Sequence, residues 1–131
     1  MEHSESQYRS LTPGFKVWLN AEGKAILGPG DLELIKAIQV THNLTKAAES
    51  VGYSYKYAWK KLQVLKTRTG QDVAIAQRGG KGGGGHVELT GWGVFLIHLF
   101  ETIQTKAEGF QKTINEELLQ FKSDFLKKEM H

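Results

Sequence analysis

The chain has 131 residues, 40% of them hydrophobic and 24% charged, with a net charge of +3 and no cysteine. This length suits one hydrophobic core with an extension, rather than two full domains, and the composition is that of an ordinary soluble protein. The lack of cysteine excludes disulfides and thiolate metal sites. No apolar run approaches the ~20 residues of a membrane span, and the polar N-terminus lacks a leader pattern, so we expect a cytoplasmic protein.

The positive charge is concentrated in about one third of the chain. Between residues 42 and 85, eight Lys and Arg residues stand against two Asp and Glu residues, a surplus of six, so the remainder has a deficit of three. Such a segment is typical of a surface that binds a polyanion, although a solvated charged face gives the same pattern.

The N-terminal region predicts an arm followed by a β-hairpin. Residues 1–14 are polar and without period, which indicates a flexible arm. Residues 15–19 (FKVWL) alternate apolar and polar side chains, residues 20–23 (NAEG) suit a turn, and residues 24–27 resume a short strand.

Three helices are predicted after this hairpin. Asp31 can cap the first, whose apolar residues keep helical spacing to about Thr41. The second begins near residue 44 and ends at Gly52, because a residue without Cβ can adopt the left-handed conformation there. Ser54 can cap a third helix, which ends at Gly70.

The third helix has two distinct faces. At about 100° per residue, the apolar side contains Ala58, Leu62 and Leu65. The opposite side contains Lys56, Lys60, Gln63 and Thr67. A cationic outer face that begins at the helix N-terminus is what a DNA-recognition helix requires. Trp59 lies at the boundary, where it either packs against a neighbouring element or contacts DNA.

A glycine-rich hairpin is predicted next. Residues 72–78 alternate, with Val73 and Ile75 on one face, and residues 86–89 pair back after the loop Gly79–Gly85 (GGKGGGG). Gly82 follows Lys81 where a nucleotide-binding P-loop requires Ser or Thr, and the loop joins two strands, so nucleotide hydrolysis is not expected. The glycines and Lys81 can instead approach a phosphate backbone closely; the alternative is a loop without a role.

The last segment predicts a long helix that starts after a cap at Thr90 and reaches about residue 125 or 128. Apolar residues recur every eleven positions, at Trp92, Ile103, Ile114 and Phe125, and again at Leu99, Phe110 and Phe121. Eleven residues in three turns nearly match a straight helix, so the stripe stays on one face. A helix of ~50 Å exceeds the ~30 Å span of so small a body, so we expect a second copy to cover the stripe. Gly109 offers an alternative break into two helices.

Several of these motifs occur together in a known family. The chain contains KVWL at residues 16–19, ELIKAI at 33–38, TKAAESVGYSYKYAW at 45–59, GGKGGGG at 79–85 and LTxxG at 89–93. Over residues 28–96 it resembles the DNA-binding domain of ModE-type molybdate-responsive regulators, relatives of the LysR-type winged helices. The resemblance implies a dimeric regulator, usually a repressor of molybdate uptake genes, that binds a near-palindromic operator. Full-length members continue into a β-rich molybdate-binding module, which we do not expect here, so no cofactor is assigned to this chain and molybdate would require a sensor supplied elsewhere.

The predicted architecture is mainly α with small β: a winged helix-turn-helix with an N-terminal hairpin, a β-wing and a long C-terminal dimerisation helix. The arm covers residues 1–14, the winged helix-turn-helix residues 15–90 and the dimerisation extension residues 91–131. Expected DNA contacts are Thr45, Lys46, Ser54, Tyr55, Lys56, Tyr57, Lys60, Lys61, Gln63, Arg78 and Lys81. Expected dimer contacts are Trp92, Leu96, Leu99, Ile103, Phe110 and Ile114.

The sequence therefore favours a homodimeric, sequence-specific regulator that binds double-stranded DNA, with a separate effector-sensing partner as an option. A winged-helix module that binds proteins without DNA specificity is the alternative. The five histidines lack metal-ligand spacing and no catalytic constellation is apparent, so neither a metal site nor an enzyme is expected.

Overall fold

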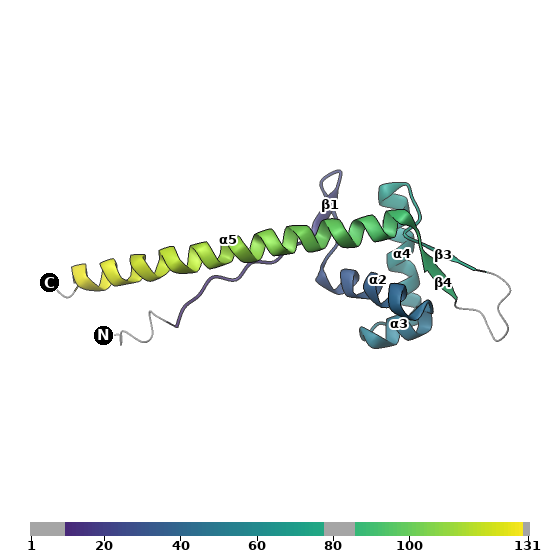
Figure 1. Ribbon diagram of the computed structural model, residues 1–131, viewed down its shortest axis with the longest axis horizontal. Helices are drawn as coiled ribbons and strands as arrows, with labels where there is room; N and C mark the ends of the chain where they lie inside the picture. Colours follow the sequence, from purple (N-terminus) through teal and green to yellow (C-terminus); the bar gives the residue numbers. More distant parts are fainter. Residues whose placement is uncertain (1–9, 78–85, 130–131) are drawn as a thin grey trace. The chain divides into compact units, whose positions relative to one another are not determined.

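Two antiparallel hairpins and four helices follow one another along the chain in the computed structural model, which describes residues 10–77 and 86–129 (Figure 1). The elements are β1 (Leu19–Ala21), β2 (Lys24–Leu27), α2 (Pro29–Thr41), α3 (Leu44–Ser50), α4 (Tyr55–Thr69), β3 (Ala74–Ala76), β4 (Val87–Leu89) and α5 (Gly91–Glu129). The predicted class, mainly α with small β, is confirmed. The chain divides into a core unit, Val17–Thr102, and an extension unit, Met1–Lys16 with Ile103–His131.

The first hairpin begins later than the sequence pattern predicts. Strand β1 starts at Leu19, the last residue of the predicted strand, and pairs with β2 in a register that shifts between Leu19 and Asn20. Phe15 instead belongs to the extension unit, where its ring packs edge-on against Phe110 with centroids 5.5 Å apart. Of the predicted strand, Phe15 thus takes part in aromatic packing, and Leu19 takes part in strand pairing.

The first helix, α2, begins two residues before the predicted cap. Gly28 occupies the N-cap position, Pro29 follows in the first turn, and Asp31 lies at the third helical position. The Gly28 amide donates a hydrogen bond to Asp31 Oδ2 at 2.9 Å. Asp31 thus stabilises the helix start from inside the first turn, where proline is also well tolerated because its missing N–H has no helical partner.

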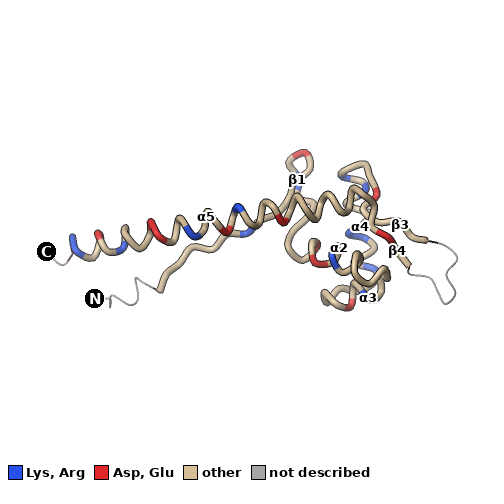
Figure 2. Tube along the Cα trace, viewed as in Figure 1, with Lys and Arg blue, Asp and Glu red and all other residues tan. Residues whose placement is uncertain are grey.

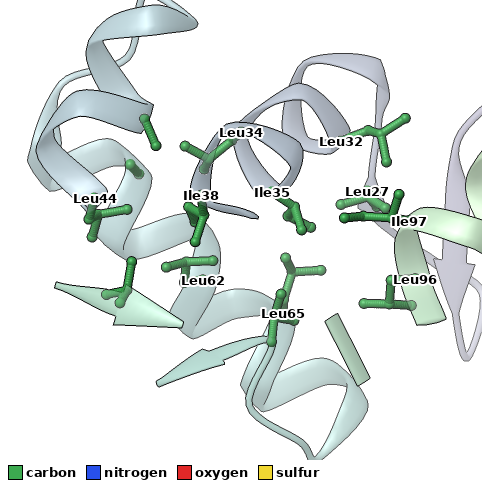
Figure 3. Close-up of a cluster of buried hydrophobic side chains, with 14 of the residues drawn as sticks. Leu27, Leu32, Leu34, Ile35, Ile38, Leu44, Leu62, Leu65, Leu96 and Ile97 are labelled. Carbon is green, nitrogen blue, oxygen red and sulfur yellow. The ribbon is translucent and has the colours of Figure 1, made fainter. Parts of the chain in front are cut away.

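The core of the unit Val17–Thr102 is a cluster of hydrophobic side chains from β2, β4 and the four helices, together with Val73 (Figure 3). Ile35, Ile38 and Phe100 are fully buried. Burying one such side chain contributes about 1.5–3 kcal/mol to stability. Figure 3 shows Leu96 and Ile97 of α5 within the same cluster as Leu62 and Leu65 of α4. The first turns of α5 are therefore part of this core.

The junction between β4 and α5 explains the LTxxG motif. Thr90 Oγ1 accepts a hydrogen bond from the Gly93 amide at 3.0 Å, which confirms the predicted cap, and it donates to the Asp72 carbonyl at 2.6 Å. The Thr90 amide donates to the Val73 carbonyl at 3.0 Å. A Cβ on Gly93 would lie only 2.3 Å from that same carbonyl oxygen, so this helix turn can approach the strand only because residue 93 is glycine.

Replacing Gly93 with Ala should therefore destabilise the protein. The methyl group meets the backbone carbonyl and the side chain of Val73, and overpacking of this kind costs about 1–3 kcal/mol. Gly91→Ala is the matched control, because a Cβ at Gly91 meets nothing within 4 Å. Urea unfolding should show a lower midpoint for Gly93→Ala and an unchanged or higher one for Gly91→Ala. Equal midpoints would contradict the close approach.

Helix α5 is continuous from Gly91 to Glu129, so the alternative of a break at Gly109 is wrong. Residues 103–129 of this helix, together with residues 10–16, form the described part of the extension unit. There, Gln111 Nε2 donates to the Pro13 carbonyl at 3.1 Å and Lys122 Nζ donates to the Leu11 carbonyl. Residues 10–14, predicted as part of the flexible arm, thus contact α5.

Candidate nucleic-acid interface

Helices α3 and α4 are joined by a short turn at residues 51–54. Asn43 caps α3 by accepting from the Lys46 amide at 2.8 Å, and Ser54 caps α4 by accepting from the Tyr57 amide at 3.1 Å. Gly52 has a φ of +77°. The turn at Gly52 and the cap at Ser54 are both confirmed, and these local contacts fix where α4 starts.

The two faces predicted for α4 are present in the structure. Ala58, Leu62 and Leu65 are buried in the core. On the other side Lys56, Lys60 and Thr67 are exposed, whereas Gln63 is half-buried. Thr45 and Lys46 at the start of α3, together with Ser54, Tyr55 and Tyr57 at the start of α4, are exposed as well. The outward face of α4 is therefore polar and open at its N-terminal end.

The lysines of α4 fall into two groups. Lys61 Nζ lies 3.3 Å from Asp31 Oδ2, and Lys66 Nζ lies 3.3 Å from Asp72 Oδ1. Among the residues that the structure describes, Lys56 and Lys60 have no ion-pair partner. Of these four lysines, Lys56 and Lys60 therefore carry charge that no side chain in the described ranges pairs.

Lys61, one of the expected DNA contacts, serves the packing of α2 against α4. Its Asp31 partner is 9% exposed and also accepts the Gly28 amide. Burial and the nearby charge of the same Asp31 carboxylate raise the pKa of the Tyr53 hydroxyl. Asp31 thus lies between the start of α2, the turn that carries Tyr53, and Lys61 of α4. Its position in the sequence does not reveal this role.

Three aromatic residues of α4 are exposed. Tyr55 is 51% exposed, Tyr57 is 46% exposed, and the Tyr57 ring packs edge-on against Tyr53 with centroids 4.7 Å apart. Trp59 is 46% exposed and lines a depression of about 290 Å³ together with Ile75 and Val87 of the second hairpin. The ring of Trp59 therefore lies beside this hairpin, which favours packing over a contact with DNA.

The second hairpin pairs Ala74 with Leu89 and Ala76 with Val87. Val73 is buried, whereas Ile75, which the sequence placed on the same face of the strand, is 51% exposed. Val73 lies before the strand begins and packs under α5 at Gly93. The expected DNA contacts Arg78 and Lys81 lie outside the described residues.

The base of this hairpin is tied to the end of α2 by contacts that the sequence analysis missed. Glu88 lies 3.1 Å from His42 Nδ1 and 3.0 Å from His86 Nε2, and the two imidazole rings stack with centroids 5.9 Å apart. The Val87 amide also donates to the His42 carbonyl at 3.0 Å. The one local indication of these contacts in the sequence is that His86 and Glu88 are two residues apart, on the same side of an extended segment. His42 is remote in sequence, so its contact with Glu88 could not be predicted.

The expected dimer contacts differ in exposure. Phe110 is 55% exposed, whereas Leu96 is 3% exposed and packs into the core of its own unit. The half-buried members of the set are Trp92, Leu99, Ile103 and Ile114. The indole of Trp92 donates to Thr69 Oγ1 at 3.1 Å, which attaches the start of α5 to the end of α4. Leu96 thus packs inside its own chain, and we do not propose it as a contact between copies.

The described part of the chain contains neither a cluster of metal ligands nor a helix suited to cross a membrane. Between residues 10 and 129, with 78–85 set aside, no three His, Asp or Glu side chains are grouped so that they could hold a metal ion. Across the same residues, no helix combines the length and apolar character that crossing a membrane requires.

The sequence is similar to those of known transcription regulators. ModE of Yersinia pestis is 36% identical over 92 residues, covering 68% of this chain and 35% of that protein. The DNA-binding transcriptional dual regulator ModE of Escherichia coli is 34% identical over 92 residues, with the same coverage. No family model matches the chain.

Among solved structures, Vibrio fischeri DarR in complex with DNA, a LysR-type regulator, matches with a TM-score of 0.49 and 21% identity, covering 70% of this chain and 29% of that one. The chain spans about one third of the length of the curated relatives it matches. Over the matched residues it is similar to proteins that are named as transcriptional regulators.

Proposed function

We propose that this chain is a sequence-specific regulator of transcription that binds double-stranded DNA through α4. In this proposal α3 and α4 form a helix-turn-helix, the N-terminal end of α4 enters the major groove, and the β3–β4 hairpin is the wing. The single observation that carries the proposal is the exposed pair Lys56 and Lys60, which has no ion-pair partner among the described residues. Cations left without an internal partner suit a polyanion.

The helix N-terminus adds to this surface. Ser54, Tyr55 and Tyr57 present hydroxyl groups where the α4 dipole already favours anions, so phosphates can bind there while Lys56 and Lys60 reach base edges or phosphates. The name of the Escherichia coli relative, a DNA-binding transcriptional dual regulator, supports the same class of partner.

The proposal includes a homodimer that represses transcription from a near-palindromic operator in the cytoplasm. The exposed apolar residues of α5 support self-association, and the resemblance to ModE-type regulators supports the operator and the repression. We assign no cofactor to this chain. A response to molybdate would come from a sensor module or partner supplied elsewhere.

Selection from a pool of random DNA duplexes tests the proposal. The expected result is an enriched near-palindrome whose half-sites lie one helical turn apart, about 34–36 Å, because a two-fold dimer presents two α4 helices. Binding should weaken steeply with salt, since Lys and Arg release counterions from the phosphates. A pool that remains random after repeated rounds would instead favour a protein-interaction module.

A further inference from the structure

A groove of about 440 Å³ separates the tip of the β1–β2 hairpin from the outward side of α4. Glu22 and Lys24 line its hairpin wall. Along α4 the polar lining residues are Lys60, Gln63, Thr67 and Arg68. All of these residues belong to the core unit, so the groove is a feature of one compact body.

The groove is positively charged. Lys24, Lys60 and Arg68 stand against one carboxylate, that of Glu22, which leaves a surplus of two positive charges. Considering only the residues that the structure describes, none of these three cations has an ion-pair partner, in contrast to Lys61 and Lys66. Like charges gathered without internal compensation raise the local concentration of an anionic partner.

The hairpin holds Lys24 in a defined place. Ile26 and Leu27 of β2 are 5% and 1% exposed, so the strand that carries Lys24 is anchored in the core. The turn consists of Glu22 and Gly23, with φ values of +50° and +80°. Positive φ at both central residues is the geometry of a tight two-residue hairpin turn, which leaves little freedom at the tip.

The length of α4 decides which part of DNA can reach this groove. The major groove is about 8.5 Å deep, which corresponds to about six residues of helix at ~1.5 Å per residue. If the N-terminal end of α4 enters the major groove, Lys56 lies inside and Lys60 lies at its rim. Gln63 and Arg68 then lie about 5 Å and 12 Å beyond the rim, on the sugar-phosphate side, where they line the same groove as Lys24.

We propose that the β1–β2 hairpin is a second phosphate-binding element, in which Lys24 and Arg68 hold the DNA strand that flanks the major groove read by α4. This inference rests on the proposed function and adds a contact that the sequence analysis did not include. Lys60 belongs to both surfaces and makes them continuous. The hairpin fixes the position of the duplex without reading its sequence, because phosphate contacts carry no base information.

The test compares Lys24→Ala with Lys106→Ala on the selected duplex and on a scrambled one. Lys106 is an exposed lysine of α5 in the extension unit, so the control removes the same charge away from the groove. Each lost phosphate contact should reduce the slope of log affinity against log salt by about 0.9, a roughly eightfold loss at 0.1 M salt. The loss should be equal on both duplexes. Glu22→Gln should have the opposite effect, because it removes the one carboxylate among the described residues that line the groove.

The outcomes separate this inference from the proposed function. If Lys24→Ala behaves like Lys106→Ala while Lys56→Ala loses binding, the hairpin does not hold DNA and the proposed function stands. If Lys24→Ala changes the preference for the selected duplex over the scrambled one, the contact is to a base and the phosphate assignment is overturned. If neither Lys24→Ala nor Lys56→Ala weakens binding, both this inference and the proposed function are wrong. Unchanged circular dichroism and melting temperature show that each variant is folded.

Discussion

Changing Lys56 and Lys60 together to Ala should abolish specific DNA binding and leave the fold intact. Both side chains are exposed on α4 and have no ion-pair partner among the described residues, so their removal leaves no buried group unsatisfied. Each contact to a base or phosphate contributes about 1–3 kcal/mol. A dimer that loses four such contacts should bind its operator about a thousandfold more weakly or worse.

Fluorescence anisotropy on the selected duplex measures this loss. The matched control is Lys106→Ala with Lys127→Ala, which removes the same charge from exposed positions on α5. Lys61 is unsuitable as a DNA-binding test, because its loss would leave the nearly buried Asp31 without its cation and weaken the packing of α2 on α4. Affinity equal to that of the control would remove α4 from the DNA interface.

Local signals were sufficient to predict α3, the turn at Gly52 and α4. Ser54 caps the start of α4 and Gly70 ends it, as predicted. The buried side formed by Ala58, Leu62 and Leu65 follows directly from the helical period. Such features depend on residues within a few positions of one another. The two faces of α4 could therefore be assigned without knowing what packs against them.

Contacts between distant segments could not be predicted in the same way. The partners of Lys61 and Lys66 lie in other elements, so the sequence showed four similar lysines on α4 where the structure has two paired and two unpaired. The position of Lys24 opposite Arg68 depends on how the hairpin packs on α4. Composition gave the net charge of this region, but only the fold shows where that charge remains uncompensated.

The second large effect concerns the apolar face of α5. Phe110 and Phe121 are 55% and 62% exposed, and they lie eleven residues apart, so they share one side of the helix. Figure 2 shows Lys residues interspersed with Asp and Glu residues along the same helix, so the apolar residues lie within an otherwise charged surface. Exposed aromatic residues repeated along one helix face are typical of an interface. We expect a second copy of the chain to cover them.

Phe121→Lys should dissociate the dimer. Its ring stacks on Phe125 of the same helix with centroids 6.3 Å apart, so a partner helix would meet two adjacent rings. Burying one Phe contributes about 1.5–3 kcal/mol, and a two-fold dimer loses two, so the dissociation constant should rise at least about a hundredfold. A lysine at the same place also introduces a charge that the interface would have to desolvate.

Leu119→Lys is the matched control for this change. Leu119 is 57% exposed on the same helix, but it lies two residues from Phe121 and therefore about 160° around the axis. Sedimentation equilibrium should give dimer mass for the unchanged chain and for Leu119→Lys, and monomer mass for Phe121→Lys at the same concentration. If both variants remain dimeric, the contact lies elsewhere on the molecule. If the unchanged chain is a monomer at high concentration, the eleven-residue stripe does not mediate self-association, and a single α4 would bind only one half-site.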